Sequence, residues 1–469
     1  MKDLFAHGVA SGDPSCSSID IWTAVSGNAS STIAWEVALD PGFDTTVASG
    51  TVDLEDAERP VGSVAHPVTI HVDELAPDTL HHYRFRSAGH VSPTGRGSTL
   101  PLADAEVELV RLGLASCARL ASASFEPYAD LARCEPDLVI HLGDYIYEDD
   151  APPHDPPTVC DDLEDYRRRH AQYRRELPLQ ELHRVAPWVS VWDDHDVADD
   201  SWRTGSAGSS EHRDEWERRR KDAELAYLGW MPQSASDSGP TAMDRRLRLG
   251  KLADVVVLDA RNAARDRPVD ESGPALVAPD DDRRILSDEQ WTWLSDCVHE
   301  CEGWLIICTQ TQVSPLRLAR LPNIRRRLRA EPFVNPGQWD GYPVERERLS
   351  RALAPVAGRV LLCSGDLHGR FHTALRLPDG SPVPEITTPS IASTPFAQAV
   401  RSKLPIPTPL LERWLGFMNP DVSFMDLEGR GSTVLDVTES SIVVTALSST
   451  EGEAHRWRLA RGSASIDPI

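Results

Sequence analysis

The chain has 469 residues, of which 40% are hydrophobic, so its length allows two domains, or one large α/β domain with an added module. It carries 48 lysine and arginine residues against 73 aspartate and glutamate residues, and this formal net charge of −25 argues against general binding to nucleic-acid phosphates. No run of 18 apolar residues is present, which excludes an obvious membrane span, and the eight cysteines form neither a CxxC pair nor a zinc-finger spacing.

Residues 1–103 are predicted to form an N-terminal β-sandwich domain. Short segments such as SIDIWTAV and LHHYRFRSA alternate polar and apolar residues, and Gly, Pro, Ser and Asn separate them. The stretch LAPDTLHHYRF is typical of a strand corner in a fibronectin type III or immunoglobulin-like sandwich. We therefore expect an all-β module of about seven strands, followed by the linker SPTGRGSTLPLADAE.

The pattern changes at residue 107, where apolar strands begin to alternate with helices. Strands are expected within residues 107–117, 137–144, 188–196, 252–262, 303–311 and 358–368, and helices within 127–136, 165–185, 214–230 and 287–300. This alternation predicts a largely parallel sheet with helices outside it. Residues 431–448 and 453–462 are predicted to add antiparallel strands, so residues 104–469 form the second predicted domain.

Residue types that bind metal ions follow several of these predicted strands. In α/β sheets the working site lies beyond the carboxyl ends of the strands. The polar residues found there are Cys117; Asp144, Tyr145, Tyr147 and Glu148; Asp193, Asp194, His195 and Asp196; Arg261 and Asn262; Thr309, Gln310 and Gln312; and Asp366 and His368. Each motif alone is explained equally well by a turn, a helix cap or a solvated acidic loop, but their shared position favours one site.

The stretch VWDDHDVADD places five aspartates around His195. They are Asp193, Asp194, Asp196, Asp199 and Asp200. Carboxylates this close cannot all ionise cheaply, so either some stay protonated or cations lie among them. Oxygen ligands suit Ca²⁺, Mg²⁺, Mn²⁺ or Fe³⁺. Two cations about 3.5–4 Å apart would clamp a phosphate ester and supply an activated hydroxide.

The order of GDYIYE, WDDHD and SGDLH resembles that of the PhoD-like family of alkaline phosphatases and phosphodiesterases, a branch of the calcineurin-like metallophosphoesterases. HGVASGDP, ASCARL, DYRRRHAQYR, VVVLDARNAARDRP and TQTQVSPL support the likeness, which covers nearly the whole chain. The resemblance implies a four-layer α/β/β/α metallophosphoesterase sandwich after the N-terminal immunoglobulin/fibronectin III-like domain. It also implies two or three metal ions, with iron (Fe³⁺) and calcium expected and Mn, Mg or Zn as the other candidates.

The resemblance also implies roles for single residues. The implied metal ligands are Cys117, Asp144, Tyr147, Asp194, Asp366 and His368. Asp144 would bridge two metal ions and help to generate the hydroxide, which makes it catalytic as well. His195 lies at the position of the histidine that contacts the scissile phosphate, so it is expected both to bind substrate and to act in catalysis.

Departures from the wider superfamily bear on the metals. Gln310 stands where the superfamily has a ligand histidine, a loss that the PhoD-like branch shares. Aspartate replaces asparagine at Asp194 and histidine at Asp366, which favours Ca²⁺ or another hard ion. Together with Gln310, Asp199 and Asp200 either hold a further metal ion or support the ligands from outside, and the start of a helix explains the two aspartates equally well.

Three further side chains have less direct expectations. Strand alternation points Asp193 away from Asp194, toward an arginine or backbone groups. Arg261 is expected to orient a loop, with substrate binding as its second interpretation. The basic segment from Arg167 to His170 either steers an anionic substrate or forms an exposed helix face.

The combined interpretation is a metal-dependent hydrolase of phosphate esters, a PhoD-like alkaline phosphatase that acts on monoesters, diesters or both through a metal-activated hydroxide. His195 would protonate the leaving group or stabilise charge on the phosphoryl oxygens. A phosphodiesterase of the phospholipase D type is an alternative within the family, and a non-catalytic cation-binding surface protein is an alternative outside it. The His and Tyr ligands argue against a glycosidase built on paired carboxylates.

The expected partner is a small phosphate ester, with no specific nucleic-acid binding and no transmembrane segment. Members of the family are commonly exported by the twin-arginine route, but the start MKDLFAHGVASGDP has neither a twin arginine nor an apolar signal core. We therefore expect either a cytoplasmic protein or the mature form of an exported one.

Overall fold

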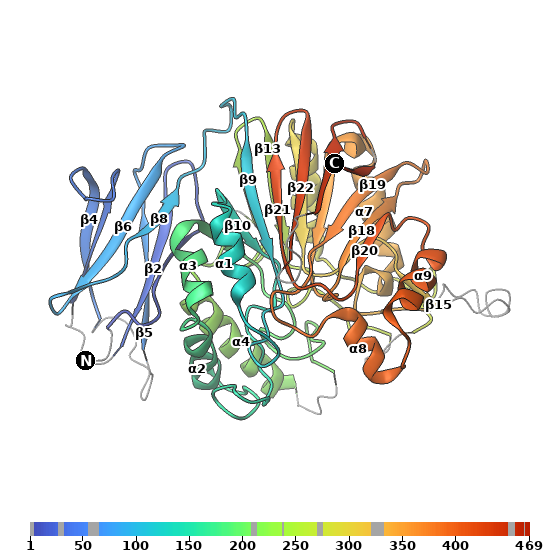
Figure 1. Ribbon diagram of the computed structural model, residues 1–469, viewed down its shortest axis with the longest axis horizontal. Coiled ribbons are helices and arrows are strands. Elements are labelled where there is room, and N and C mark those ends of the chain that lie inside the picture. The colour runs from blue at the N-terminus through green and yellow to red at the C-terminus, as the bar shows by residue number, and fades with distance from the viewer. Residues whose placement is uncertain are drawn as a thin grey trace.

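The computed structural model describes residues 4–26, 32–54, 65–207, 213–236, 239–269, 275–319, 333–448, 455–463 and 465–469. Within these ranges the chain forms two large β-sheets with helices on their outer sides, and a smaller sheet at the N-terminal end (Figure 1). No helix in these ranges is both long and apolar enough to cross a membrane.

The N-terminal region is all β, as expected. Its strands are β1 (Val9–Gly12), β2 (Ile19–Val25), β3 (Thr32–Ala38), β4 (Thr46–Asp53), β5 (His66–Val72), β6 (Leu80–Ser87), β7 (His90–Val91) and β8 (Gly95–Ser98). One layer contains β4, β3, β6, β7 and β8, and the other contains β1, β2 and β5. Apolar residues such as Ile21, Ile33 and Phe85 pack between the two layers.

The second N-terminal layer belongs to a ten-stranded sheet, in the order β24-β23-β22-β21-β9-β10-β11-β1-β2-β5. Its other strands are β9 (Val110–Ala115), β10 (Leu138–His141), β11 (Pro187–Ser190), β21 (Gly431–Val437), β22 (Ser441–Ser448), β23 (His455–Ala460) and β24 (Ile466–Pro468). Strand β1 pairs in parallel with β11, through Ser11 with Pro187 and Gly12 with Trp188. The division at residue 103 stays a prediction, and this pairing joins its two sides.

The helices associated with this sheet are α1 (Glu126–Arg133), α2 (Leu163–Tyr173), α3 (Leu177–Val185) and α4 (Arg213–Trp230). The single helix predicted over 165–185 is therefore wrong, because α2 ends at Tyr173 and α3 begins afresh at Leu177. Pro178 lies in the first turn of α3, where its missing amide proton costs no hydrogen bond, and a proline further inside one continuous helix would break it.

A second, seven-stranded sheet has the order β12-β13-β14-β17-β19-β18-β20. Its strands are β12 (Arg245–Leu249), β13 (Ala253–Leu258), β14 (Trp304–Thr309), β17 (Val360–Ser364), β18 (Arg370–Arg376), β19 (Pro382–Thr387) and β20 (Phe424–Asp426). The remaining elements are α5 (Asp288–Glu300), β15 (Arg317–Ala319), β16 (Phe333–Val334), η1 (Trp339–Gly341), α7 (Pro343–Leu353), η2 (Ala354–Arg359), α8 (Phe396–Lys403) and α9 (Thr408–Met418).

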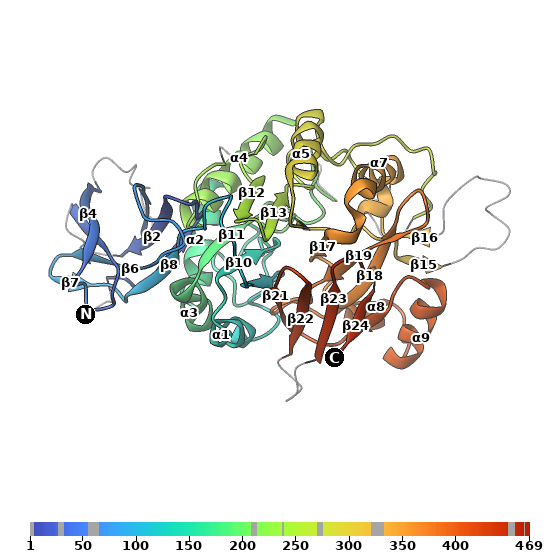
Figure 2. The same cartoon turned by 90° about the horizontal axis from the view of Figure 1, so that it is seen from above.

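The two sheets share one core, because alternate residues of the central strands face opposite sides. Val255, Ile306 and Leu361 join the cluster that contains β9, β10 and β11, whereas their neighbours Val256 and Ile307 pack with residues of α5 and α7. Burial on both faces explains why these strands are continuously apolar rather than alternating. The architecture is thus the four-layer sandwich that the family resemblance implied, and not the single sheet that the strand–helix alternation suggested (Figure 2).

Candidate metal centre

The loops after β9, β10, β11 and β17 bring the predicted ligands together. Cys117, Asp144, Asp366 and His368 all adopt positive φ angles, of 58°, 56°, 62° and 55°. Residues with a Cβ rarely adopt this conformation, and such strain is typically held at functional sites by the surrounding structure. Gly143 lets the loops after β10 and β11 lie close together, because any residue with a Cβ here would place that atom 2.5 Å from the Cβ of Asp193. Its φ of 95° also favours glycine.

The first ligand set joins the two sheets. Single ligand atoms of Cys117, Asp144 and His368 all lie within 4.8 Å of one another. The Tyr147 hydroxyl extends this set, because it donates to Asp144 Oδ2 at 2.7 Å and lies 3.1 Å from His368 Nε2. These four side chains therefore offer a thiol, a carboxylate, a phenol and an imidazole to one point.

Hydrogen bonds from outside fix the orientation of this first set. His368 Nδ1 lies 3.0 Å from the carbonyl oxygen of Thr394, to which it must donate, so Nε2 presents its lone pair to the site. The Ser393 hydroxyl lies 2.8 Å from the Tyr147 oxygen. Sequence reasoning missed both partners, which follow β19 in a stretch without any ligand motif.

The first set fits a cation chemically. Burial and the nearby Asp144 raise the pKa values of the Cys117 thiol and the Tyr147 phenol well above their ordinary values. Both groups therefore keep their protons unless a positive charge compensates. A metal ion bound there would stabilise the thiolate and phenolate and release the two protons.

The second ligand set consists of carboxylates around a buried arginine. Arg261 Nε donates to Asp193, and Arg261 Nη2 lies 3.3 Å from Asp366 Oδ1 and 3.4 Å from Asp194 Oδ1. The Gln338 amide donates to the other oxygen of Asp366. Arg261 is thus the arginine toward which strand alternation was expected to point Asp193. The Arg261 side chain is 1% exposed and does not open into the pocket.

This carboxylate set also has capacity for a cation. Asp193 Oδ2 and Asp194 Oδ1 are buried and have no hydrogen-bond partner among the described residues. Although burial alone would raise the pKa of Asp194, Arg261 and His195 hold it below its ordinary value, so this carboxylate is charged. Oxygens of Asp144, Asp193 and Asp194 lie within 4.8 Å of one another, so Asp144 belongs to both sets.

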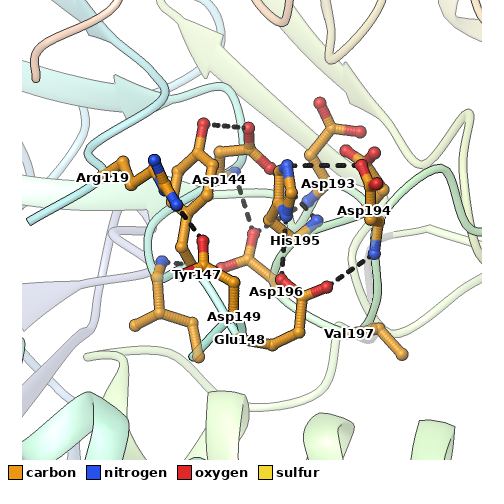
Figure 3. Close-up of polar contacts among 12 residues, drawn as sticks. Arg119, Asp144, Tyr147, Glu148, Asp149, Asp193, Asp194, His195, Asp196 and Val197 are labelled. Atoms are coloured by element: carbon orange, nitrogen blue, oxygen red, sulfur yellow. Dashed lines mark hydrogen bonds and ion pairs between the residues drawn. The ribbon is translucent and has the colours of Figure 1, made fainter. Parts of the chain in front are cut away.

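His195 lies between the two sets (Figure 3). Its Nδ1 is 2.8 Å from Glu148 Oε2, its ring stacks on Tyr147 at 4.1 Å between centroids, and its amide donates to Asp144 Oδ1. Burial alone would lower the pKa of His195, but the carboxylates of Glu148 and Asp144 raise it well above its ordinary value. The imidazole is therefore held in place and protonated; the motif GDYIYE contains Glu148, but sequence reasoning gave it no role.

Asp196 and Gln310 act on the backbone rather than at the site. Asp196 accepts amide protons from Asp144, Ile146 and Asp193, which ties the β10 and β11 loops together (Figure 3). The side chain of Gln310 donates to the carbonyl oxygen of Trp192 at 2.7 Å and accepts from the amide of Ala260 at 3.0 Å. Both groups of the Gln310 amide are thus engaged by backbone.

Asp199 and Asp200 lie at the mouth of the site, in turns, so the helix start considered for them is wrong. The Asp199 amide donates to Glu148, its side chain is 68% exposed, and its carboxylate lies 3.6 Å from His195 Nε2. The Asp200 amide donates to Asp194 Oδ2 at 2.6 Å. Their backbones therefore support His195 and Asp194, while both carboxylates face the pocket.

Two of the four residues in the basic segment of α2 are buried, so the segment does not form only an exposed face. Arg169 is fully buried and donates to the carbonyl oxygens of Tyr147 and Pro156. His170 is fully buried as well, against Tyr145. Arg169 therefore fixes the loop that follows the GDYIYE motif, a role that an exposed helix or a substrate-steering patch would not need.

A pocket of about 230 Å³ opens over both ligand sets. Five aspartates line it, together with His195, His368, Asn335 and Gln338, and with Leu367 and Phe396 on its apolar side. No lysine or arginine is among the described residues that line it.

The models of two families match the chain: PhoD-like phosphatase over residues 112–446, and the PhoD-like phosphatase N-terminal domain over residues 1–101. The chain belongs to the PhoD-like phosphatase family. It is 30% identical over 399 residues to alkaline phosphatase D of Bacillus subtilis (strain 168), and the match covers 80% of this chain but 66% of that protein, just under two thirds of its length. A solved structure of PhoD has a TM-score of 0.85 at 25% identity, covering 100% of this chain and 93% of the other.

These matches confirm the fold and the family that the motifs predicted. Phosphoester hydrolysis with the help of metal ions is the chemistry of the PhoD-like family, and the clusters around Asp144 are the places in this chain where metal ions fit. The ligand assignments of single residues stay predictions.

Proposed function

We propose that this protein hydrolyses phosphate esters with two or more metal ions held on either side of Asp144. One observation carries the proposal: a thiol–phenol–imidazole set and a carboxylate set share Asp144, and His195 lies against both. A structural cation site would need neither the shared carboxylate nor a protonated imidazole at the pocket. This arrangement favours a catalytic centre over the alternative of a non-catalytic cation-binding surface protein.

The two sets favour different metals. Cys117 and Tyr147 offer anionic ligands that suit Fe³⁺, with Asp144 and His368 completing the set. Asp194 and Asp366 offer hard oxygens that suit Ca²⁺, with Mn, Mg or Zn as alternatives. Bound there, the cations would supply positive charge to the phosphoryl oxygens and lower the pKa of a water molecule.

The protein's own residues handle the proton and the charge. Glu148 holds Nδ1 of His195, so Nε2 is the nitrogen that faces the pocket and can donate a proton to the leaving oxygen. Arg261 holds three carboxylates together without entering the pocket, and it helps to keep the Asp194 carboxylate charged by lowering its pKa. Asp196 keeps the loops of Asp144 and Asp193 at a fixed separation, which preserves the geometry that catalysis needs.

The charge of the pocket favours diesters over monoesters. A diester has one negative charge, whereas a monoester at alkaline pH has two, and five aspartates line the pocket without any lysine or arginine among the described residues. The metal ions and the protonated His195 would have to balance the second charge against these aspartates, so like-charge repulsion should weaken binding of the monoester.

The test is a paired assay on metal-replete protein with nitrophenyl phosphate and bis-nitrophenyl phosphate. We expect turnover of both and a kcat/KM about tenfold higher for the diester, equivalent to about 1.4 kcal/mol. A higher value for the monoester would contradict the preference alone. Elemental analysis showing bound iron and calcium without turnover of either ester would contradict the function and support the cation-binding protein.

An absorbance scan of the same preparation tests the first ligand set. Iron bound to Tyr147 and Cys117 should produce a visible charge-transfer band, and Tyr147→Phe should shift or remove it while keeping the ring stacked on His195. Iron-containing protein with an unchanged spectrum in this variant would remove Tyr147 from the ligand set.

A further inference from the structure

Helix α9 has two apolar stripes, and only one of them is buried. The inner stripe consists of Leu411, Leu415 and Met418, and the outer stripe consists of Leu410, Trp414 and Phe417. Residues spaced four and then three apart lie along one helix face. The three outer side chains are 58%, 49% and 74% exposed. We call this stripe the outer α9 face.

Exposure of the outer α9 face to water is energetically unfavourable. Its three side chains expose roughly 400 Å² of largely apolar area, a size at which exposed patches on monomers often mark binding sites. A standard protein–protein interface buries about 800 Å² on each partner, so the face alone is too small for a stable dimer.

The inner stripe of α9 packs with residues that also line the catalytic pocket, so the outer α9 face lies on the other side of the helix from those residues. Helix α8 begins at Phe396, which lines the pocket and whose amide donates to the carbonyl oxygen of His368 at 3.0 Å. Leu367 also lines the pocket, and it belongs to the same apolar cluster as Leu411 and Leu415 of the inner stripe. Figures 1 and 2 both place α8 and α9 at the edge of the molecule, away from the N-terminal strands.

Helices α8 and α9 carry three basic residues, Arg401, Lys403 and Arg413, and one acidic residue, Glu412, although the whole chain has a net charge of −25. Lys403 at the end of α8 and Arg413 within α9 are exposed and have no ion-pair partner among the described residues. Arg401 pairs with Glu428. Aromatic and aliphatic side chains flanked by unpaired basic groups are typical of helices that lie in a lipid–water interface, where the basic groups meet anionic headgroups.

We propose that the outer α9 face docks the protein on a phospholipid–water interface that contains anionic lipid. Trp414 and Phe417 would enter the headgroup region, and Lys403 and Arg413 would contact lipid phosphates. The inference goes beyond the proposed function, because it concerns where the protein works. It stands or falls independently of what the pocket hydrolyses.

The experiment compares the full, metal-replete chain with two variants by flotation with large unilamellar vesicles. The vesicles contain phosphatidylcholine alone or phosphatidylcholine with 30% phosphatidylglycerol. The double variant Leu410→Ser/Phe417→Ser removes apolar groups from the outer α9 face. Leu177→Ser is the matched control, since Leu177 on α3 is 75% exposed but lies on another part of the molecule.

We expect the wild-type chain and Leu177→Ser to bind mixed vesicles, more weakly without phosphatidylglycerol, and the double variant to bind at least about tenfold more weakly. Turnover of soluble bis-nitrophenyl phosphate should be equal in all three proteins, which shows that the variants are folded. The proposal is overturned by wild-type protein that does not float, or by equal flotation of the double variant. A wild-type dimer that the double variant converts to monomer would also overturn it, because a second copy would then cover the face.

If none of the three proteins turns over the soluble ester, the proposed function fails. Equal melting temperatures then show that the variants are folded, and flotation still decides whether the protein docks.

Discussion

The first and second ligand sets, here called the two halves of the candidate metal centre, limit the repulsion between buried anionic groups in opposite ways. In the first half, Cys117 and Tyr147 sit in a dry environment that keeps their protons on, so this half is neutral until a metal ion arrives. In the second half, Arg261 is a permanent cation among Asp193, Asp194 and Asp366. The carboxylate repulsion that the sequence suggested is therefore partly balanced by the protein itself.

This difference predicts how each half would bind and release a metal ion. The first half gains anionic ligands only by losing protons, so its metal ion should bind tightly, depend on pH and exchange slowly. In the second half Arg261 already holds the carboxylates in place and Asp194 is charged, so this half should bind and release a hard cation with little rearrangement. If both halves bind metal ions as proposed, we expect the ion of the first half to exchange slowly and that of the second half to exchange readily.

Selective chelation should produce the largest difference between the two halves. Incubation with EGTA should remove calcium from the second half and reduce turnover to the level of metal-free protein, while iron and its visible absorbance remain. Calcium should restore activity within the time of mixing. The measurements are elemental analysis, absorbance and turnover on one sample; loss of iron together with calcium would show that the halves are not independent.

Replacement of His195 tests the residue that lies between the halves. His195→Ala should reduce turnover about 100- to 10,000-fold on esters with poor leaving groups, and much less on nitrophenyl esters, because only a poor leaving group needs a proton. Glu148→Gln keeps a hydrogen-bonding side chain beside Nδ1 and should have a smaller effect in the same direction. Equal losses for good and poor leaving groups would rule out the acid role.

Removal of Arg261 tests the second half alone. Arg261→Met should lower the free energy of unfolding of metal-free protein by about 3–5 kcal/mol, because two buried carboxylates and the partly exposed Asp366 lose their arginine partner. Calcium should recover more stability in this variant than in the wild type. Arg265→Met is the matched control, since Arg265 is also buried but bonds Tyr342 and a backbone carbonyl. Denaturant titrations with and without calcium decide the outcome; an equal calcium effect in all three proteins would contradict it.

The ligand motifs were visible in the sequence because they follow apolar strands. Strand ends are marked by a change in composition, so the order of residue types alone could place Cys117, Asp144 and Asp366 near one another. The alternation of strands and helices could not show that β9–β11 lie in a different sheet from β13, β14 and β17, because both sets are buried on two faces and look alike.

The supporting contacts could not be predicted, because they depend on proximity between distant segments. Gln338 bonds Asp366 from a loop 28 residues away in sequence, and Thr394 orients His368 from 26 residues away. Neither stretch carries periodicity or a motif that marks it. Helices α7 to α9 were also missed, since each is short, with 8 to 11 residues, and charged residues interrupt the apolar pattern.

The smallest expected effect concerns two histidines, His368 in the loop before β18 and His372 within β18. His368 has a partner for each nitrogen, whereas His372 in β18 is buried with no hydrogen-bond partner among the described residues. Burial and the nearby Arg370 lower the pKa of His372 from 6.5 to about 3. Below pH 6.5 the unfolded chain therefore takes up a proton that the folded chain refuses, and stability falls as the pH falls toward 3.

Substitution of His372 should remove this one proton from the acid sensitivity. His372→Phe suits the contacts with Trp457 and Phe424, and relative to pH 7 the variant should lose about 2 kcal/mol less stability than the wild type at pH 5. The metal ligands titrate equally in both proteins, so the difference between their urea denaturation curves isolates this side chain. Parallel curves from pH 7 to pH 5 would show that His372 takes up its proton in the folded chain as readily as in the unfolded chain, which would contradict the prediction.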